Sequence, residues 1–234
     1  MKITFLILAL FACYLAVEIL MLPSCNDLKS KNPETTALIE RRLEQAKAEG
    51  RTPVRRQQWV PIELISKHLL RAVIASEDAR FFEHNGFDTE AIKKAIEYDL
   101  KKGRFARGAS TITQQLAKNL YLSESKNPLR KLKEAIITTR LEANLSKKRI
   151  LELYLNVIEW GEDIYGAEAA SRHYFGKPAK DLSPAEAAYL AAMIPNPRTV
   201  FNPSKYPKRV ARRQKRILKL MNTTSLPREW QSQN

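Results

Sequence analysis

Apolar residues recur at helical spacing along most of the chain. Leu69, Leu70, Val73 and Ile74 occupy positions i, i+1, i+4 and i+5 of a stretch that ends at Glu77. The same periodicity continues at Ile92, Ile96 and Leu100; at Ile112, Leu116 and Leu120; at Ile150, Leu151, Tyr154 and Ile158; and at Val210, Ile217, Leu218 and Met221. This pattern predicts a mainly α-helical fold from residue 63 onward. No run of alternating residues is long enough to demand a sheet.

Capping residues predict where several helices begin. Asn127 and Pro128 provide an N-cap followed by proline at the first helical position, and Ser146 can cap the next helix. Residues 183–186, Ser-Pro-Ala-Glu, form a capping box with proline at the same place. A separate, exposed helix is predicted over residues 34–50, where a glycine ends it.

The N-terminal residues form the most apolar stretch of the chain. Between Ile3 and Leu22 only Glu18 is charged, and a helix of this length spans about 30 Å, the thickness of a bilayer core. We therefore predict a transmembrane anchor over residues 1–24, a linker with a juxtamembrane helix over 25–58, and one main domain over 59–225. A cleaved signal peptide and lipidation at Cys25 remain alternatives.

The charge of the chain indicates an anionic partner. Forty Lys and Arg residues against 25 Asp and Glu residues give a net charge of +15, which suits nucleic acid, an acidic lipid surface or a substrate that bears phosphate. The seven glycines contain no phosphate-binding loop of the common kinds. Three histidines and two cysteines, without the spacing of a zinc motif, make a dedicated zinc site improbable.

One candidate for acid–base chemistry lies at the predicted end of a helix. Glu77 and Asp78 are followed by two phenylalanines and His84. The negative end of the helix dipole and nearby aromatic rings both raise the pKa of a carboxyl, which favours Glu77 as a general base. The alternative is a solvated helix end with His84 in a structural hydrogen bond.

Two further segments carry polar side chains suited to a ligand. Ser110, Gln114 and Lys118 share one polar face of a predicted helix, whose N-terminal N–H groups can receive an anion and whose amides suit hydroxyl-rich ligands such as sugars. The alternative is an exposed polar face. Arg130 and Glu134 form either a surface ion pair or a second carboxylate beside a cationic cluster.

Together, these segments resemble the motifs of the peptidoglycan glycosyltransferase family, which is also found as a domain of class A penicillin-binding proteins. Residues 77–86 resemble the motif EDxxFxxHxG, 108–119 resemble GxSTITQQxxKN, 130–134 resemble RKxxE and 147–156 resemble KxxILExYLN. Residues 165–175 resemble the fifth motif. The five segments occur in order, and the resemblance covers about residues 60–200. It implies a mainly α, lysozyme-like helical glycosyltransferase domain.

The resemblance also implies an activity. Members of the family polymerise lipid II into β-1,4-linked glycan strands and release polyprenyl diphosphate in a single inverting displacement. Glu77 is then the general base and Glu134 a second catalytic acid. The implied substrate-binding residues are Asp78, Ser110, Gln114, Gln115, Lys118, Asn119, Lys126, Arg130, Lys131 and Lys147. Lys126 stands where many relatives have arginine, which can bind phosphate in a bidentate manner.

The resemblance finally implies surroundings for the enzyme. No resident metal is predicted; the one candidate cofactor is a divalent cation, Mg²⁺ or Mn²⁺, at the substrate diphosphate. The expected partners are lipid II, the growing glycan chain, membrane lipids and other cell-wall synthesis proteins, but not nucleic acid. The expected location is the bacterial cytoplasmic membrane, crossed once, with the catalytic domain on the outer face. Basic residues 208–219, with Arg213 among them, either face lipid head groups or form a solvated face.

Three other functions are alternatives. A lytic muramidase-like enzyme shares the expected fold and a catalytic glutamate. A non-catalytic cell-wall scaffold is a second possibility. A helical nucleic-acid-binding protein accounts for the charge, but not for the apolar N-terminal segment or for the paired acids.

Overall fold

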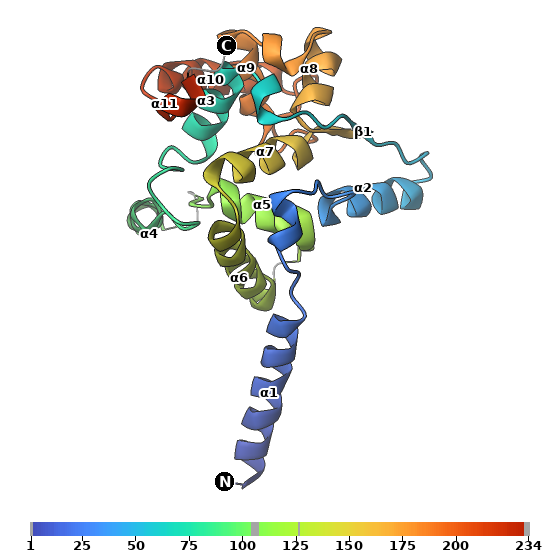
Figure 1. Ribbon diagram of the computed structural model, residues 1–234, viewed down its shortest axis with the longest axis vertical. Coiled ribbons are helices and arrows are strands. Elements are labelled where there is room, and N and C mark those ends of the chain that lie inside the picture. The colour runs from blue at the N-terminus through green and yellow to red at the C-terminus, as the bar shows by residue number, and fades with distance from the viewer. Residues whose placement is uncertain (1, 104–107, 126, 232–234) are drawn as a thin grey trace.

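The computed structural model describes residues 2–103, 108–125 and 127–231. Helix α1 (Lys2–Leu20) projects away from a body formed by the other helices (Figure 1). Within the described ranges, no helix is both long and apolar enough to cross a membrane, so the predicted transmembrane span is not confirmed.

The body is mainly α-helical, as the sequence predicts. Four helices carry most of the predicted site: α3 (Lys67–Glu77), α5 (Ile112–Tyr121), α6 (Pro128–Asn144) and α7 (Lys147–Val157). Helix α4 (Thr89–Lys102) lies between α3 and α5 in the chain. The others are α2 (Ala37–Ala48), α8 (Ala167–Phe175), α9 (Pro184–Met193), α10 (Pro207–Met221) and α11 (Arg228–Gln231). Short 3₁₀ turns lie at η1 (Asn26–Lys29), η2 (Ile62–Leu64) and η3 (Ala179–Asp181). The predicted caps Asn127, Ser146 and Ser183 each accept a backbone hydrogen bond.

A small sheet lies beside the helices. Its order is β1 (Arg56–Gln57), β3 (Ile164–Tyr165), β2 (Glu159–Gly161), with β1 and β3 parallel and β2 antiparallel to β3. The sequence did not predict these strands, because two or three residues are too few to show an alternating pattern.

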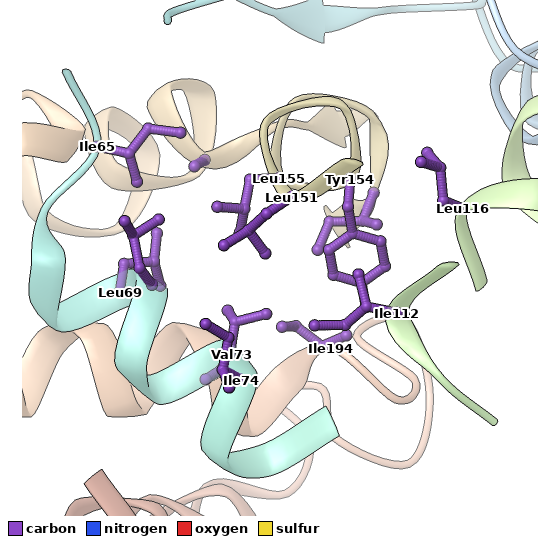
Figure 2. Packing of buried hydrophobic residues seen from close by; sticks show 14 of the residues in the cluster. Ile65, Leu69, Val73, Ile74, Ile112, Leu116, Leu151, Tyr154, Leu155 and Ile194 are labelled. Atoms are coloured by element: carbon purple, nitrogen blue, oxygen red, sulfur yellow. The ribbon is translucent and has the colours of Figure 1, made fainter. Parts of the chain in front are cut away.

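The core is formed where α3, α5 and α7 face one another (Figure 2). Leu69, Ile112, Leu116 and Leu151 are fully buried in it, which confirms the predicted apolar faces of these three helices. Helices α9 and α10 pack on the other side of α3. The apolar positions of α4 behave differently, since Ile96 and Leu100 are exposed and α4 stands apart from the body (Figure 1).

Helix α2 differs from the exposed helix predicted over residues 34–50. It begins at Ala37, because the hydroxyl of Thr36 accepts a hydrogen bond from the N–H of Ile39. Leu38, Ile39 and Ala46 are buried, and α2 packs against α5. The proposed division of the chain at residues 24 and 58 stays a prediction.

Two glycines at the ends of α8 should differ in how much stability the protein loses when each is replaced by alanine. Gly166 has φ of +81° and an added Cβ would lie 2.7 Å from the carbonyl oxygen of Asn156, whereas Gly176 has φ of +68° and no atom within 4 Å of the added Cβ. We expect Gly176→Ala to lower the free energy of unfolding by about 1–2 kcal/mol. Gly166→Ala should add a packing cost of about 1–3 kcal/mol to that strain. Urea unfolding of both variants measures the difference, and equal losses would contradict this packing argument.

Candidate active site

Glu77 is the last residue of α3, as predicted. Its side chain is 8% exposed. One carboxylate oxygen, Oε1, accepts a hydrogen bond from Nη2 of Arg213 at 2.8 Å and contacts the hydroxyl of Ser76 at 3.5 Å. The other, Oε2, accepts from Nε2 of Gln115 at 3.2 Å. The carboxylate is therefore held from α10 and from α5, which are distant from α3 in the sequence.

Asp78 joins the end of α3 to the beginning of α5. Its Oδ2 accepts the backbone N–H of Ile112 at 3.0 Å, and its Oδ1 lies 2.9 Å from Nε2 of His84. The N–H of Gly86 donates to Nδ1 of the same ring, so Nε2 carries the proton and donates to Asp78. Both carboxylate oxygens have partners in the protein, so Asp78 positions its neighbours, and its predicted substrate contact stays a prediction. His84 fills the structural role that was its alternative.

The surroundings of Glu77 act on its charge in opposite directions. Burial raises the pKa of the Glu77 carboxyl, as the sequence suggested, whereas the charge of Arg213 and the hydrogen bonds from Gln115, Arg213 and Ser76 lower it. Burial prevails, so the pKa lies above the ordinary value of a glutamate. Such a group can take a proton at neutral pH more readily than an exposed carboxylate.

The two adjacent glutamines of α5 have different roles. Gln114 is buried and completes a capping box: its Oε1 accepts the N–H of Thr111, and its own N–H donates to the hydroxyl of Thr111. Gln114 therefore stabilises the beginning of α5, and its predicted substrate contact stays a prediction. Gln115 instead connects two functional groups, because it donates to Glu77 and accepts from the hydroxyl of Tyr154 at 2.8 Å.

One cavity, which we call the base pocket, has a volume of about 360 Å³ and contains Glu77 and Ser110 in its wall. Its lining comprises residues 75–80 at the end of α3, Asp88, Glu90, Ala91 and Lys94 before and within α4, residues 108–111 before α5, and Arg213, Arg216, Ile217 and Leu220 of α10. A hydroxyl group in this pocket can reach the buried Glu77 carboxylate.

A second cavity, which we call the lysine pocket, has a volume of about 170 Å³ and contains Lys118 and Asn119. Its lining comprises Leu38 and Arg42 of α2, Gln115, Lys118 and Asn119 of α5, Glu124, Tyr154, Ile158, Glu159 and residues 194–197. Burial lowers the pKa of Lys118, and the charge of Glu134 opposes this effect. Gln115 links the two pockets, because it lines the lysine pocket and donates a hydrogen bond to Glu77 in the wall of the base pocket.

Glu134 lies at the centre of a small cationic cluster on α6. Its side chain is 5% exposed; Oε2 accepts from Nη1 of Arg130 at 2.6 Å, and Oε1 accepts from Nζ of Lys131. Both alternatives for this segment therefore hold in part: the pair is a helix ion pair, and the carboxylate is buried beside two cations. Lys118 on α5 lies within the electrostatic influence of this cluster.

Lys147 and Lys126 are the other two cations that were predicted to bind substrate. Nζ of Lys147 pairs with Glu142 at 2.8 Å and lies 4.6 Å from the centre of the Phe81 ring, and Lys147 lines neither pocket. The predicted substrate contact of Lys147 stays a prediction. Lys126 lies outside the described residues.

Arg213 lies closer to the candidate site than the sequence analysis predicted. It was assigned to a surface facing lipid or solvent, but it contacts Glu77. A signal was present: Arg213 lies three residues after Val210 and four before Ile217, both of which are buried. This spacing puts Arg213 on the inner face of α10.

The carboxylates of the site do not fit a resident divalent cation. Both oxygens of Glu134 accept from cations. Asp78, His84 and Asp88 lie together, but Asp78 is engaged by Ile112 and His84, and Asp88 caps α4 and pairs with Arg80. Mg²⁺ prefers free oxygen ligands in near-octahedral geometry. A cation brought by the substrate diphosphate stays a prediction.

Comparison with known proteins identifies the family. The family model described as "Transglycosylase" matches residues 44–222. The chain belongs to the transglycosylase family. The chain is 51% identical over 196 residues to a biosynthetic peptidoglycan transglycosylase of Nitrosospira multiformis, covering 84% of this chain and 85% of the relative. A protein of the same name from Laribacter hongkongensis is 45% identical over 219 residues, covering 94% of this chain and 96% of the relative.

Almost all the residues that line the two pockets lie within the part of the chain that matches the transglycosylase family. This part includes the whole of α3 to α10, and hence Glu77, Gln115, Lys118, Glu134 and Arg213. Helix α2 lies partly ahead of the match, although Arg42 contributes to the lysine pocket.

Proposed function

We propose that this protein is a peptidoglycan glycosyltransferase that polymerises lipid II into β-1,4-linked glycan strands, with Glu77 as the general base. The observation that carries the proposal is a buried carboxylate in the wall of one pocket, hydrogen-bonded to a residue that lines a second pocket. Gln115 touches Glu77 and lines the second pocket, where Lys118 provides positive charge. A reaction that joins two sugar substrates needs this combination of a base, two adjacent sites and a cation. The lysozyme-like character of the domain is part of the proposal.

In the proposed reaction the acceptor sugar lies in the base pocket and the donor sugar reaches into the lysine pocket. The 4-hydroxyl of the acceptor gives its proton to Glu77 while its oxygen bonds to the anomeric carbon of the donor. The bond from that carbon to the diphosphate oxygen breaks, and the electron pair leaves with polyprenyl diphosphate. Attack from the face opposite the leaving group converts the α bond into a β bond.

Positive charge is needed where the diphosphate leaves. Lys118 is the candidate within the lysine pocket, and Arg130 and Lys131 add charge on α6. Preorganised cations stabilise developing negative charge without further reorganisation. In this proposal Glu134 keeps Arg130 and Lys131 in place, and Asn119 binds sugar hydroxyls in the lysine pocket, as Ser110 does in the base pocket.

The contacts of Glu77 favour synthesis over a lytic activity. A muramidase-like enzyme needs a protonated carboxyl that donates to the glycosidic oxygen. The ion pair of Glu77 with Arg213 opposes the rise in pKa that burial causes and so supports the carboxylate, which is the form that a base requires.

The test compares two substrates. The full-length protein in detergent is incubated with labelled lipid II and, separately, with purified sacculi. We expect glycan polymer from lipid II and no soluble fragments from sacculi. Fragment release from sacculi without polymer formation would contradict the proposal, as would a folded protein inactive on both.

We further propose that the N-terminal segment holds the enzyme at the outer face of the bacterial cytoplasmic membrane, in a single pass, beside its lipid-linked substrate. Phe5, Leu6 and Leu10 of α1 are exposed, and Ile96 and Leu100 of α4 add apolar surface on the body. Exposed apolar side chains on this scale fit membrane lipid as a partner. Other cell-wall synthesis proteins remain proposed partners.

Removal of residues 2–24 should separate membrane attachment from catalysis. The truncated enzyme loses the contacts of Arg140 with the carbonyl oxygens of Ile19, Leu22 and Pro23, but it keeps both pockets. We expect activity on lipid II in liposomes to fall by at least about tenfold, because the effective concentration at the membrane is lost. Activity in detergent should change much less. Equal liposome activity for both proteins would contradict the anchoring proposal.

A further inference from the structure

We infer that Arg213 is a positioning residue for the reaction: it holds the Glu77 side chain as an oriented carboxylate whose free lone pairs face the base pocket. The inference rests on the proposed function, since it names the partner that Glu77 needs in order to act as a base. It gives Arg213 of the basic helix α10 a role other than lipid contact or exposure to solvent.

The geometry around Glu77 fixes the plane of the carboxylate. Arg213 donates to Oε1 at 2.8 Å and Gln115 donates to Oε2 at 3.2 Å, so each oxygen has a partner from a different helix. Tyr154 holds the amide of Gln115 in turn, through a hydrogen bond of 2.8 Å to its Oε1. Each carboxylate oxygen accepts more than one hydrogen bond, so the remaining lone pairs are available to a substrate hydroxyl.

Arg213 is itself held in place. The central carbon of its guanidinium lies 5.4 Å from the centre of the Phe201 ring, within the range of a cation–π contact. Val210 and Ile217, one turn to either side, are buried, and α10 packs on α3 and α9. Its neighbour Arg212, by contrast, is exposed. A surface arginine that only binds lipid needs no such support.

The charged groups around Glu77 leave Arg213 as its direct counter-ion. On α3, Asp78 is engaged by His84 and by the N–H of Ile112. On α7, burial raises the pKa of the Tyr154 hydroxyl well above its ordinary value, so Tyr154 is neutral.

No other described residue near Glu77 forms a second ion pair with its carboxylate. On α5, Gln115 carries no charge. The base pocket also holds Arg80, Lys94, Arg216, Asp88 and Glu90 in its lining. Among the described residues, only Arg213 forms an ion pair with Glu77.

Loss of the Arg213 charge should move the pH dependence of the reaction. Burial and the charge of Arg213 act on the pKa of Glu77 in opposite directions, so removal of the charge leaves the effect of burial unopposed. The carboxyl then stays protonated to a higher pH. The base is active only when deprotonated, so the variant should lose rate at low and neutral pH and recover part of it at alkaline pH.

The experiment measures kcat/KM on labelled lipid II against pH for the full-length enzyme in detergent. We expect the midpoint of the acid limb to move upward by about 1 pH unit or more in Arg213→Met, because an adjacent opposite charge shifts a carboxyl pKa by about 1–3 units. Arg213→Lys keeps the charge and should move the midpoint less. Arg212→Met removes the same charge from an exposed position on the same helix and should keep the wild-type midpoint.

Several outcomes would overturn the inference. One is an Arg213→Met enzyme that loses the same factor of rate at every pH, as expected for a merely structural or substrate-binding residue. Another is an unchanged profile. If Arg213→Met fails to fold by circular dichroism, Arg213→Gln replaces it, because it also removes the charge but keeps a hydrogen-bond donor, and a midpoint that does not rise in that variant counts against the inference. A wild-type enzyme that makes no polymer would instead refute the proposed function.

Discussion

The Glu77→Gln variant is expected to lose about 10²–10⁴-fold of the polymerisation rate, which is the usual contribution of a general base. Glutamine has nearly the same shape, but its single oxygen can replace only one of the two acceptors that Arg213 and Gln115 contact. It also cannot take a proton from the acceptor hydroxyl. The variant loses the ion pair with Arg213, so a modest fall in stability accompanies the loss of rate. Initial rates on labelled lipid II measure the effect, and circular dichroism verifies the fold.

Glu152→Gln is the matched control for Glu77→Gln. Glu152 is also a poorly exposed carboxylate, with 15% of its side chain exposed; it pairs with Arg149 and lines neither pocket. This control should lose stability without a comparable loss of rate. Near-wild-type activity in the folded Glu77→Gln enzyme would remove Glu77 from the mechanism.

The Glu134→Gln variant is expected to lose about 10²-fold of the rate, comparable to the removal of one preorganised group that stabilises developing charge. Glutamine cannot balance the charges of Arg130 and Lys131, and both cations then reorient. The cost in stability should be smaller than for a fully buried pair, because the side chains of Arg130 and Lys131 are 20% and 52% exposed. Rates at saturating and at low lipid II concentrations measure the effects on kcat and on KM.

Glu168→Gln is the control for this second variant. Glu168 is 4% exposed in its side chain and pairs with Arg172 at 2.7 Å on α8, away from both pockets. The Glu168→Gln variant should lose stability but keep nearly the wild-type polymerisation rate. A Glu134→Gln enzyme that behaves like Glu168→Gln would show that Glu134 is only a structural ion pair.

Local signals in the sequence were enough to predict most of the helices and the place of Glu77 at a helix end. Caps such as Ser146 and Ser183 act within one helical turn, and the predicted faces of α3, α5 and α7 form the core. Glu77 was predicted from its place at a helix end beside aromatic residues, and its burial confirms that part of the reasoning. These features depend on residues close together in the chain.

The features that were missed depend on distant contacts. Gln114 and Gln115 are adjacent in the sequence, yet one caps the helix and the other touches Glu77, because their side chains leave α5 in different directions. Arg213 meets Glu77 only because α10 packs across α3. The strands β1 and β3 pair across more than one hundred residues with two residues each. No local pattern specifies contacts of this kind.

The central claim is that a buried Glu77 carboxylate removes the proton from the acceptor hydroxyl. Its most direct test is the pH–rate profile of lipid II polymerisation for wild type beside Glu77→Gln, over the range in which both proteins stay folded. We predict a single acid limb for the wild type, with a midpoint above the ordinary value of about 4.3 for a glutamate, and a low residual rate without that limb for the variant. The same limb in both enzymes, or no limb in the wild type, would contradict the role of Glu77.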